Sequence, residues 1–200
     1  IITPEREILS TGSLAVPNPF RPGEATIFKD WRAHGWVDMR RAIAVSSNVY
    51  FYTIGGGFGD VKGLGVTKIR EWIQKFGLSE KTGIDIANEK AGFIPGPEWK
   101  EKNNPEDPIW RLGDTYHLSI GQDNLQVTPV QMAVAVAAFA NGGKILEPRV
   151  LKEVKNTQGR TIIQTKTKIR RELDVTPEHL LVIREGMRLD RNGFVEDWGN

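Results

Sequence analysis

The sequence of 200 residues contains no cysteine. Disulfides, thiol nucleophiles and thiolate metal sites are therefore excluded. Long apolar runs are missing as well: the longest, from Met132 to Ala140, has nine residues, whereas a membrane-spanning helix needs about 20. We expect no membrane span in these residues, so any membrane anchor would have to lie upstream of Ile1.

An excess of one charge is also missing, because 27 basic residues face 25 acidic ones and the net charge is +2. Nucleic-acid-binding domains usually carry a basic stripe, so we expect no nucleic-acid partner. The three histidines, His34, His117 and His179, do not have the spacing of a zinc motif. No Gly-x-Ser-x-Gly elbow is present. We therefore expect no metal, no cofactor and no hydrolase built on such an elbow.

What is present is typical of one globular domain. The apolar fraction is 39% and the charged fraction is 26%, and 200 residues can bury a sizeable core. Asp38 is a suitable N-cap for a helix that ends at Ala44. The stretch from Val66 to Phe76 has one apolar face, which predicts a second helix ending before Gly77. Between them, Gly55 to Gly59 lacks the Lys-[Ser/Thr] of a phosphate loop, and we interpret it as a flexible turn.

Two further helices are expected in the second half of the chain. Thr128-Pro129-Val130-Gln131 is a capping box with proline at the first helical position. The residues that follow, Met132 to Ala140, are apolar on all sides, so this helix should be buried. The last helix begins at Thr176 and places Leu180, Ile183 and Met187 on one face.

The remaining segments predict strands and loops. Thr26 to Trp31 reads as a strand, and residues 150–155 and 160–165 read as a hairpin around an Asn-Thr-Gln-Gly turn. Residues 79–115 have little periodicity and several prolines. We interpret them as a long irregular excursion, and loops of this length are often functional.

The main candidate for chemistry is the triplet Ser46-Ser47-Asn48, which apolar residues flank on both sides. A hydroxyl and a carboxamide two residues apart, on a bend between helices, can face the same cleft. The hydroxyl can pass a proton, and the amide can hydrogen-bond a substrate or orient a lysine. A polar turn between two helices would have the same composition, so the triplet alone is weak.

Two other segments imitate catalytic motifs. Lys81-Thr82-Gly83 spells the Lys-[Thr/Ser]-Gly motif of penicillin-binding transpeptidases, but it follows a helix stop and reads as a turn. Thr26-Ile27-Phe28-Lys29 imitates Ser-x-x-Lys, whose serine must begin a helix so that the lysine can reach the hydroxyl. Its surroundings predict an extended segment instead. We interpret both segments as non-catalytic.

Several blocks in order resemble the transpeptidase domain of class B penicillin-binding proteins, of the penicillin-binding protein 2 type. They extend from about residue 1 to about residue 189 and include Phe28-Lys29-Asp30-Trp31, His34-Gly35-Trp36-Val37-Asp38, Ser46-Ser47-Asn48-Val49-Tyr50-Phe51-Tyr52, Phe76-Gly77-Leu78, Lys81-Thr82-Gly83-Ile84-Asp85-Ile86, Trp99-Lys100, Trp110, Gly113-Asp114-Thr115, Ser119-Ile120-Gly121-Gln122 and Val127 to Ala133. The resemblance implies an α+β fold of the serine β-lactamase and penicillin-binding type, with helices packed on an antiparallel sheet.

The resemblance also implies a reaction. A serine in Ser-x-x-Lys attacks the penultimate D-alanine of a peptidoglycan stem peptide, and the acyl-enzyme passes to an amine on a neighbouring strand. By this analogy Ser46 relays a proton, and Asn48 holds the lysine and the substrate amide. Ser47, Gly121 and Gln122 are expected to line the substrate groove. β-Lactam antibiotics would be ligands, and membrane-bound proteins of cell wall synthesis would be partners.

The chain lacks two of the three catalytic motifs of the family. No Ser-x-x-Lys occurs in it, and the catalytic Lys-Thr-Gly is expected beyond Asn200. We therefore interpret residues 1–200 as a partial transpeptidase domain, inactive by itself, from a protein of the bacterial cytoplasmic membrane with this domain on the periplasmic side. Two alternatives stay open: a non-catalytic module that binds wall peptides or partners, and a β-lactamase or β-lactam-sensing relative.

Overall fold

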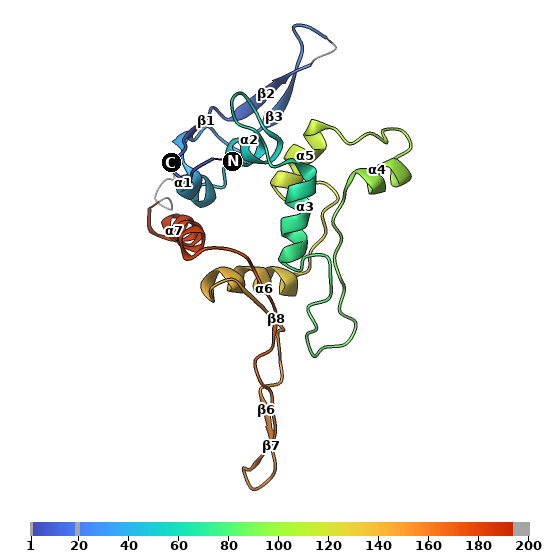
Figure 1. Ribbon diagram of the computed structural model, residues 1–200, viewed down its shortest axis with the longest axis vertical. Coiled ribbons are helices and arrows are strands. Elements are labelled where there is room, and N and C mark those ends of the chain that lie inside the picture. The colour runs from blue at the N-terminus through green and yellow to red at the C-terminus, as the bar shows by residue number, and fades with distance from the viewer. Residues whose placement is uncertain (1, 19–20, 194–200) are drawn as a thin grey trace. The chain divides into compact units, whose positions relative to one another are not determined.

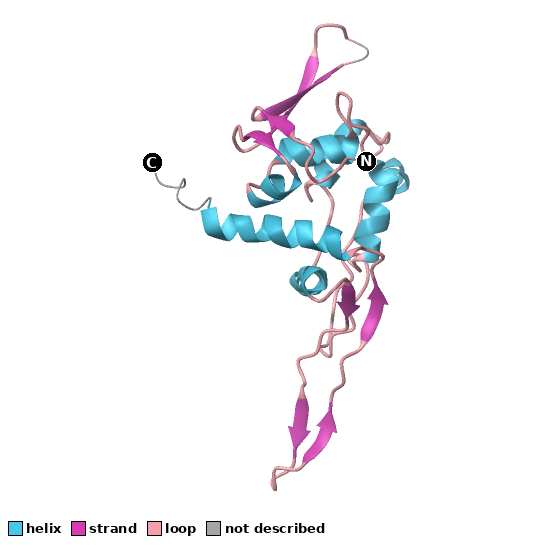
Figure 2. Cartoon of the chain, turned by 60° about the vertical axis from the view of Figure 1, so that its left-hand side comes forward, coloured by secondary structure: helices cyan, strands magenta, loops and turns pink. Residues whose placement is uncertain are grey.

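The computed structural model describes residues 2–18 and 21–193. It divides the chain into two compact units. Unit 1 consists of Ile1–Arg70, Pro95–Asp123 and Leu181–Asn200, and unit 2 consists of Glu71–Ile94 and Asn124–Leu180. Helices α3 (Gly65–Lys75) and α7 (Pro177–Gly193) each begin in one unit and end in the other. Figures 1 and 2 trace the elements along the chain.

Unit 1 contains two antiparallel strand pairs. β1 (Ile8–Ser10) pairs with β4 (Gly35–Val37), and β2 (Ser13–Pro17) pairs with β3 (Ala25–Lys29). The predicted strand at 26–31 is confirmed as far as Lys29, and the chain leaves the strand at the next residue. β3 therefore delivers the Lys29-Asp30-Trp31 segment to the helices that follow.

The helices of unit 1 are α1 (Met39–Ala44), α2 (Asn48–Gly56), α4 (Pro97–Asn103) and α5 (Leu112–Ser119). The predicted cap of α1 is confirmed, because an Asp38 side-chain oxygen accepts a hydrogen bond from Arg41 N at 2.8 Å. Two apolar clusters of buried residues form the core: Leu14, Val49, Tyr52 and Tyr116 in one, and Val37, Ala42, Val45 and Tyr50 in the other. α2 contributes to both clusters.

The interpretation of the Gly55 run as a flexible turn is wrong for its first two residues, which belong to helix α2. A Cβ on Gly55 would lie 1.9 Å from Ser119 Oγ, and one on Gly56 would lie 2.3 Å from the Tyr116 ring. Only glycine lets α2 approach α5 so closely. Helix α2 ends at Gly56, and its C-cap Gly57 has a φ of +92°, which favours glycine.

The excursion at 79–115 is less irregular than predicted, because it contains α4 and the first part of α5. Within unit 1, the buried ammonium group of Lys100 holds residues 100–114 of this excursion together. It lies 3.1 Å from Asp107 Oδ2 and 2.8 Å from Asp114 Oδ2. Sequence reasoning missed this interaction because the three residues come from separate turns of an unpatterned segment.

Unit 2 is built around α6 (Pro129–Ala140), whose predicted capping box is confirmed. Its buried side chains Val134 and Ala138 pack with Ile145 and Leu173. The prediction that this helix is buried all round is wrong, because Met132 and Val136 are each 42% exposed. An all-apolar sequence does not specify which face is covered, and the described residues cover only one.

The strands of unit 2 also form two antiparallel pairs. β5 (Lys144–Leu146) pairs with β8 (Ile169–Glu172), and β6 (Glu153–Lys155) pairs with β7 (Thr161–Gln164). The second pair is the predicted hairpin, with shorter strands. The described part of the chain thus contains four two-stranded sheets, which is consistent with an incomplete α+β fold.

Helix α7 confirms the predicted last helix. Its buried residues are Leu180, Val182 and Gly186, whereas Met187 of the predicted apolar face is 42% exposed. In unit 1, Gly186 lies against Ile43, and Glu185 pairs with Arg40 at 2.7 Å. Among the described residues, no helix is both long enough and apolar enough to cross a membrane.

Candidate functional site

The triplet Ser46-Ser47-Asn48 forms a bend between α1 and α2, as predicted. Ser46 has a φ of +52°, in the left-handed region that costs energy for any residue with a Cβ. Ser47 then caps α2, accepting a hydrogen bond from Tyr50 N through its side chain. The change of chain direction is therefore concentrated at Ser46, and the new helix starts at Asn48.

The three side chains of the bend have different surroundings. Ser46 is exposed, Ser47 is fully buried and Asn48 is partly buried. The Ser47 hydroxyl donates to Asp30 Oδ2 at 3.0 Å, and Asn48 Nδ2 donates to Lys29 O at 3.4 Å. Ser46 and Asn48 can therefore face a ligand. The Ser47 side chain points into the protein and has no exposed surface, so it cannot line a substrate groove.

Asp30 is the centre of the hydrogen-bond network beneath the bend. Its Oδ2 accepts hydrogen bonds from Ser10 Oγ at 3.2 Å, Ser47 Oγ at 3.0 Å and Val49 N at 3.0 Å. Its Oδ1 accepts from Trp31 N at 2.9 Å. Burial raises the pKa of this carboxyl, but the hydrogen bonds lower it by more, so the pKa lies below its usual value. Asp30 is therefore an anion at the N-terminus of α2, where the helix dipole stabilises it.

His34 lies next to this carboxylate. Its Nε2 is 3.5 Å from Asp30 Oδ1, and among the described residues neither ring nitrogen has a hydrogen-bond partner. The ring also contacts the Trp31 ring, with 4.9 Å between centroids. Burial lowers the pKa of His34 more than the charge of Asp30 raises it. The imidazole is therefore neutral at pH 7.

Three hydrogen bonds join the residues on either side of Asp30 to the bend and to its neighbours Val45 and Tyr52. Lys29 O accepts from Asn48 Nδ2 and from Tyr52 OH, the latter at 3.3 Å. Trp31 Nε1 donates to Val45 O at 3.0 Å. Sequence reasoning placed Lys29-Asp30-Trp31 in a strand and in a family block, but gave Asp30 no role. A carboxylate directly after a predicted strand, among aromatic residues, was the available signal.

The other two predicted groove residues lie on a separate segment. Gly121 and Gln122 form the turn after α5, and both are exposed. Gly121 has a φ of +73°, and a Cβ there would have nothing within 4 Å. In the described part of the chain, no hydrogen bond, ion pair or ring contact joins these two residues to the bend. Their neighbour Ile120 packs against the buried cluster that contains Val49 and Tyr52 of α2.

The two imitations of catalytic motifs have structural roles. Glu89 Oε2 accepts from Gly83 N at 3.0 Å, and Glu89 Oε1 accepts from both the amide and the hydroxyl of Thr82, which is buried. Lys81-Thr82-Gly83 is therefore a turn closed by a carboxylate. Residues 26–29 lie in β3, paired with β2, so they are extended, as predicted.

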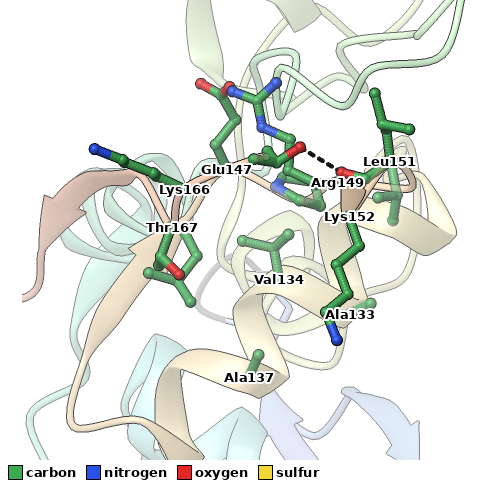
Figure 3. Close-up of a pocket in the computed structure, with 13 residues that line it drawn as sticks. Ala133, Val134, Ala137, Glu147, Arg149, Leu151, Lys152, Lys166 and Thr167 are labelled. Atoms are coloured by element: carbon green, nitrogen blue, oxygen red, sulfur yellow. Dashed lines mark hydrogen bonds and ion pairs between the residues drawn. The ribbon is translucent and has the colours of Figure 1, made fainter. Parts of the chain in front are cut away.

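None of the predicted site residues lines either of two pockets that the described residues form. A pocket of about 540 Å³ in unit 2 has α6 side chains such as Val134 and Ala137 as its floor, with Glu147, Arg149 and Lys166 at its edge (Figure 3). A second pocket, of about 930 Å³, lies between the β2–β3 pair and Leu112 in unit 1. In residues 2–18 and 21–193 no group of three or more acidic or histidine residues could hold a metal.

An α+β fold with a Ser-x-Asn bend between two helices is the arrangement expected of a penicillin-binding or serine β-lactamase domain. The comparison with protein families gives the more specific assignment. Residues 5–195 match the family model of the penicillin binding protein transpeptidase domain, and the chain belongs to this family.

Characterised relatives are similar in sequence. Peptidoglycan D,D-transpeptidase MrdA of Acinetobacter baumannii is 37% identical over 133 residues, which cover 66% of this chain and 19% of that protein. The MrdA protein of Haemophilus influenzae is 34% identical over 156 residues, which cover 77% of this chain and 22% of that protein. The chain thus spans about a fifth of the length of these relatives.

Solved structures are similar in fold. PBP2 of Helicobacter pylori, solved in complex with MreC, has a TM-score of 0.71 and 27% identity over 94% of this chain and 31% of that chain. PBP2 of Pseudomonas aeruginosa, solved in complex with WCK 5153, has a TM-score of 0.72 and 26% identity over 94% of this chain and 39% of that one.

Proposed function

We propose that this chain is the part of a peptidoglycan D,D-transpeptidase that carries the second catalytic motif. The observation that supports this most strongly is the Ser46-Ser47-Asn48 bend, which exposes a hydroxyl beside a carboxamide in a chain of the transpeptidase family. In this proposal the nucleophilic Ser-x-x-Lys precedes Ile1 in the parent protein, and the catalytic Lys-Thr-Gly follows Asn200.

The reaction is acyl transfer through a serine ester. The serine hydroxyl attacks the carbonyl of the penultimate D-alanine, and a lysine takes its proton. The peptide bond to the terminal D-alanine breaks, and this residue leaves as an amine after receiving a proton. An amine of a neighbouring stem peptide then attacks the ester, which forms the cross-link and regenerates the serine.

Ser46 and Asn48 have different roles in this proposal. The exposed hydroxyl of Ser46 passes the proton to the departing amine and takes one from the attacking amine. The carboxamide of Asn48 already donates to Lys29 O, so its orientation is fixed and its oxygen can accept a hydrogen bond from the lysine ammonium. Gly121 and Gln122 border the substrate groove, where a glycine lets a peptide approach the backbone.

The parent protein is proposed to work with other proteins of cell wall synthesis. Two structural neighbours support this: a PBP2 in complex with MreC, and a peptidoglycan synthase complex that coordinates polymerisation and crosslinking. Peptidoglycan lies outside the cytoplasmic membrane, so the domain would act on the periplasmic side and the parent protein would be membrane-anchored. β-Lactams would acylate the nucleophilic serine.

Labelling with a fluorescent penicillin tests the proposal. The chain of residues 1–200 is compared with a longer product of the same gene that extends beyond both ends. We expect a covalent label on the longer protein only, lost when the serine of its Ser-x-x-Lys is replaced by alanine. A label on residues 1–200 alone would contradict the motif assignment. No label on either would favour a non-catalytic wall-binding module, and rapid loss of the label by hydrolysis would favour a β-lactamase.

A further inference from the structure

Asp30 lies at the centre of the contacts that keep the bend in one conformation. Its carboxylate accepts hydrogen bonds from Ser47 Oγ inside the bend and from Val49 N in the first turn of α2, each at 3.0 Å. It also accepts from Ser10 Oγ of β1 at 3.2 Å. The same carboxylate oxygen, Oδ2, receives all three hydrogen bonds. Asp30 thus joins a strand, the bend and a helix end at a single atom.

The bend needs such an anchor because its backbone is not intrinsically stable. Ser46 has a φ of +52°, which a residue with a Cβ adopts only when its surroundings require it. Immediately before Ser46, Val45 O accepts a hydrogen bond from Trp31 Nε1, and immediately after Ser46, the Ser47 hydroxyl donates to Asp30. The strained residue is therefore fixed from both sides by adjacent residues of one segment.

Burial makes the anchor rigid. The Asp30 side chain has no exposed surface, and Ser47 is fully buried. A hydrogen bond in such a place is not exchanged for water, and losing one partner leaves the other without a substitute. The N-terminus of α2 adds an electrostatic attraction to the carboxylate.

We propose that Asp30 is a positioning residue for acyl transfer: through Ser47 it fixes the bend, so that the Ser46 hydroxyl and the Asn48 carboxamide keep the orientation that the reaction needs. This role rests on the function proposed above. Asp30 touches neither substrate nor nucleophile, and it acts entirely through the two residues of the bend that it supports.

The serine pair around Asp30 provides a matched test. Ser47 and Ser10 are both fully buried, and both donate to the same carboxylate oxygen. Ser47→Ala and Ser10→Ala each remove one hydroxyl from that oxygen, but only the first releases the bend. Both variants are made in the longer gene product, and the second-order rate constant of acylation by a fluorescent penicillin is measured for the folded protein.

We expect Ser47→Ala to lower the acylation rate constant by about 10- to 100-fold, because a displacement of about 1 Å can cost that much. Ser10→Ala should stay near the wild-type rate, while both variants lose thermal stability. Ser47→Thr, which keeps a hydroxyl, should recover most of the rate. If Ser47→Ala does not fold, Ser47→Gly replaces it, because glycine is tolerated at an N-cap.

Two results would overturn the inference: Ser47→Ala reacting at the wild-type rate, or both alanine variants losing rate by the same factor. The second result would mean that Asp30 only stabilises the fold. A wild-type protein that takes no label at all would overturn the proposed function, and the inference with it. The wild-type measurement therefore tests the function, and the ratio between the two variants tests the role of Asp30.

Discussion

Gln131 offers the most demanding test of the structure of unit 2. Its side chain is 1% exposed, although it lies in the first turn of α6. Its Oε1 accepts from Thr128 N at 2.8 Å, which completes the capping box. Its Nε2 donates to Ala91 O at 2.7 Å and to Glu80 O at 2.8 Å, with Gly77 O at 3.4 Å. One amide thus holds both ends of the loop that carries Lys81-Thr82-Gly83.

Gln131→Glu removes the donors while keeping the size and one acceptor. Two hydrogen bonds, at Glu80 O and Ala91 O, are lost, and each loss leaves a partly buried carbonyl group without its donor. Each loss costs about 1 to 2 kcal/mol. The negative charge at the helix N-terminus recovers about 0.5 kcal/mol. We therefore expect a loss of about 2 to 3 kcal/mol at pH 7.

The loss should depend on pH in a defined direction. The new carboxylate would face carbonyl oxygens, so the pKa of residue 131 in the folded variant should lie above its value of about 4.3 in the unfolded chain. Protonation restores one donor. The variant is therefore least destabilised below about pH 4.3, and its deficit grows as the pH rises to the folded-state pKa.

Urea unfolding at several pH values measures both effects. It should be done on the longer gene product, with hydrogen exchange at the Thr82 amide as a local readout. Gln126→Glu is the control, because Gln126 is exposed and the same change of charge there should cost less than about 0.5 kcal/mol. Equal losses in the two variants, or a deficit that does not change with pH, would refute this reasoning.

Three further predictions concern single groups. Tyr50→Phe should leave the free energy of unfolding unchanged or raise it, because its buried hydroxyl has no hydrogen-bond partner in the part of the chain that the structure describes. Tyr116→Phe should cost about 1 kcal/mol, because Tyr116 OH donates to a backbone oxygen at 2.7 Å. Chemical unfolding measures both, and the reverse order would contradict the structure. Lys81→Ala should leave penicillin labelling of the longer protein unchanged, and a lost label would mean that this Lys-Thr-Gly is catalytic. Stability should fall as the pH drops below about 6.5, because burial lowers the pKa of His34 in the folded state, so the unfolded chain binds the proton more tightly. His34→Gln should make the urea midpoint depend less on pH. An equal slope in the variant and the wild type would contradict this prediction.

Local signals made much of the fold predictable. The cap at Asp38, the capping box at Thr128 and the helix stop at Gly77 depend on residues within one or two turns of each other, and all three are confirmed. The hairpin at 150–165 is confirmed for the same reason, because its turn and strands are contiguous. Such features require only short-range hydrogen bonds and dihedral preferences.

Features set by distant packing were predicted poorly. Gly55 and Gly56 look like a helix break, yet they belong to α2 because α5 lies against them. Met132 and Val136 look like core residues, yet they are exposed. In both cases the outcome depends on which other segment covers the helix face, and the residue types alone carry no information about that neighbour.

The sequence by itself determined that Ser46, Ser47 and Asn48 form a bend between two helices and that the chain resembles a penicillin-binding transpeptidase domain, because motifs and caps are contiguous. Tertiary structure alone decided that the Ser47 hydroxyl turns inward while Ser46 faces solvent. It also decided that Asp30, 16 residues before Ser46, lies beneath the bend. The physical reason is that a buried carboxylate needs hydrogen-bond donors, which come from whichever segments the fold places within about 3 Å of it. In this chain, one of those segments is the Ser46-Ser47-Asn48 bend.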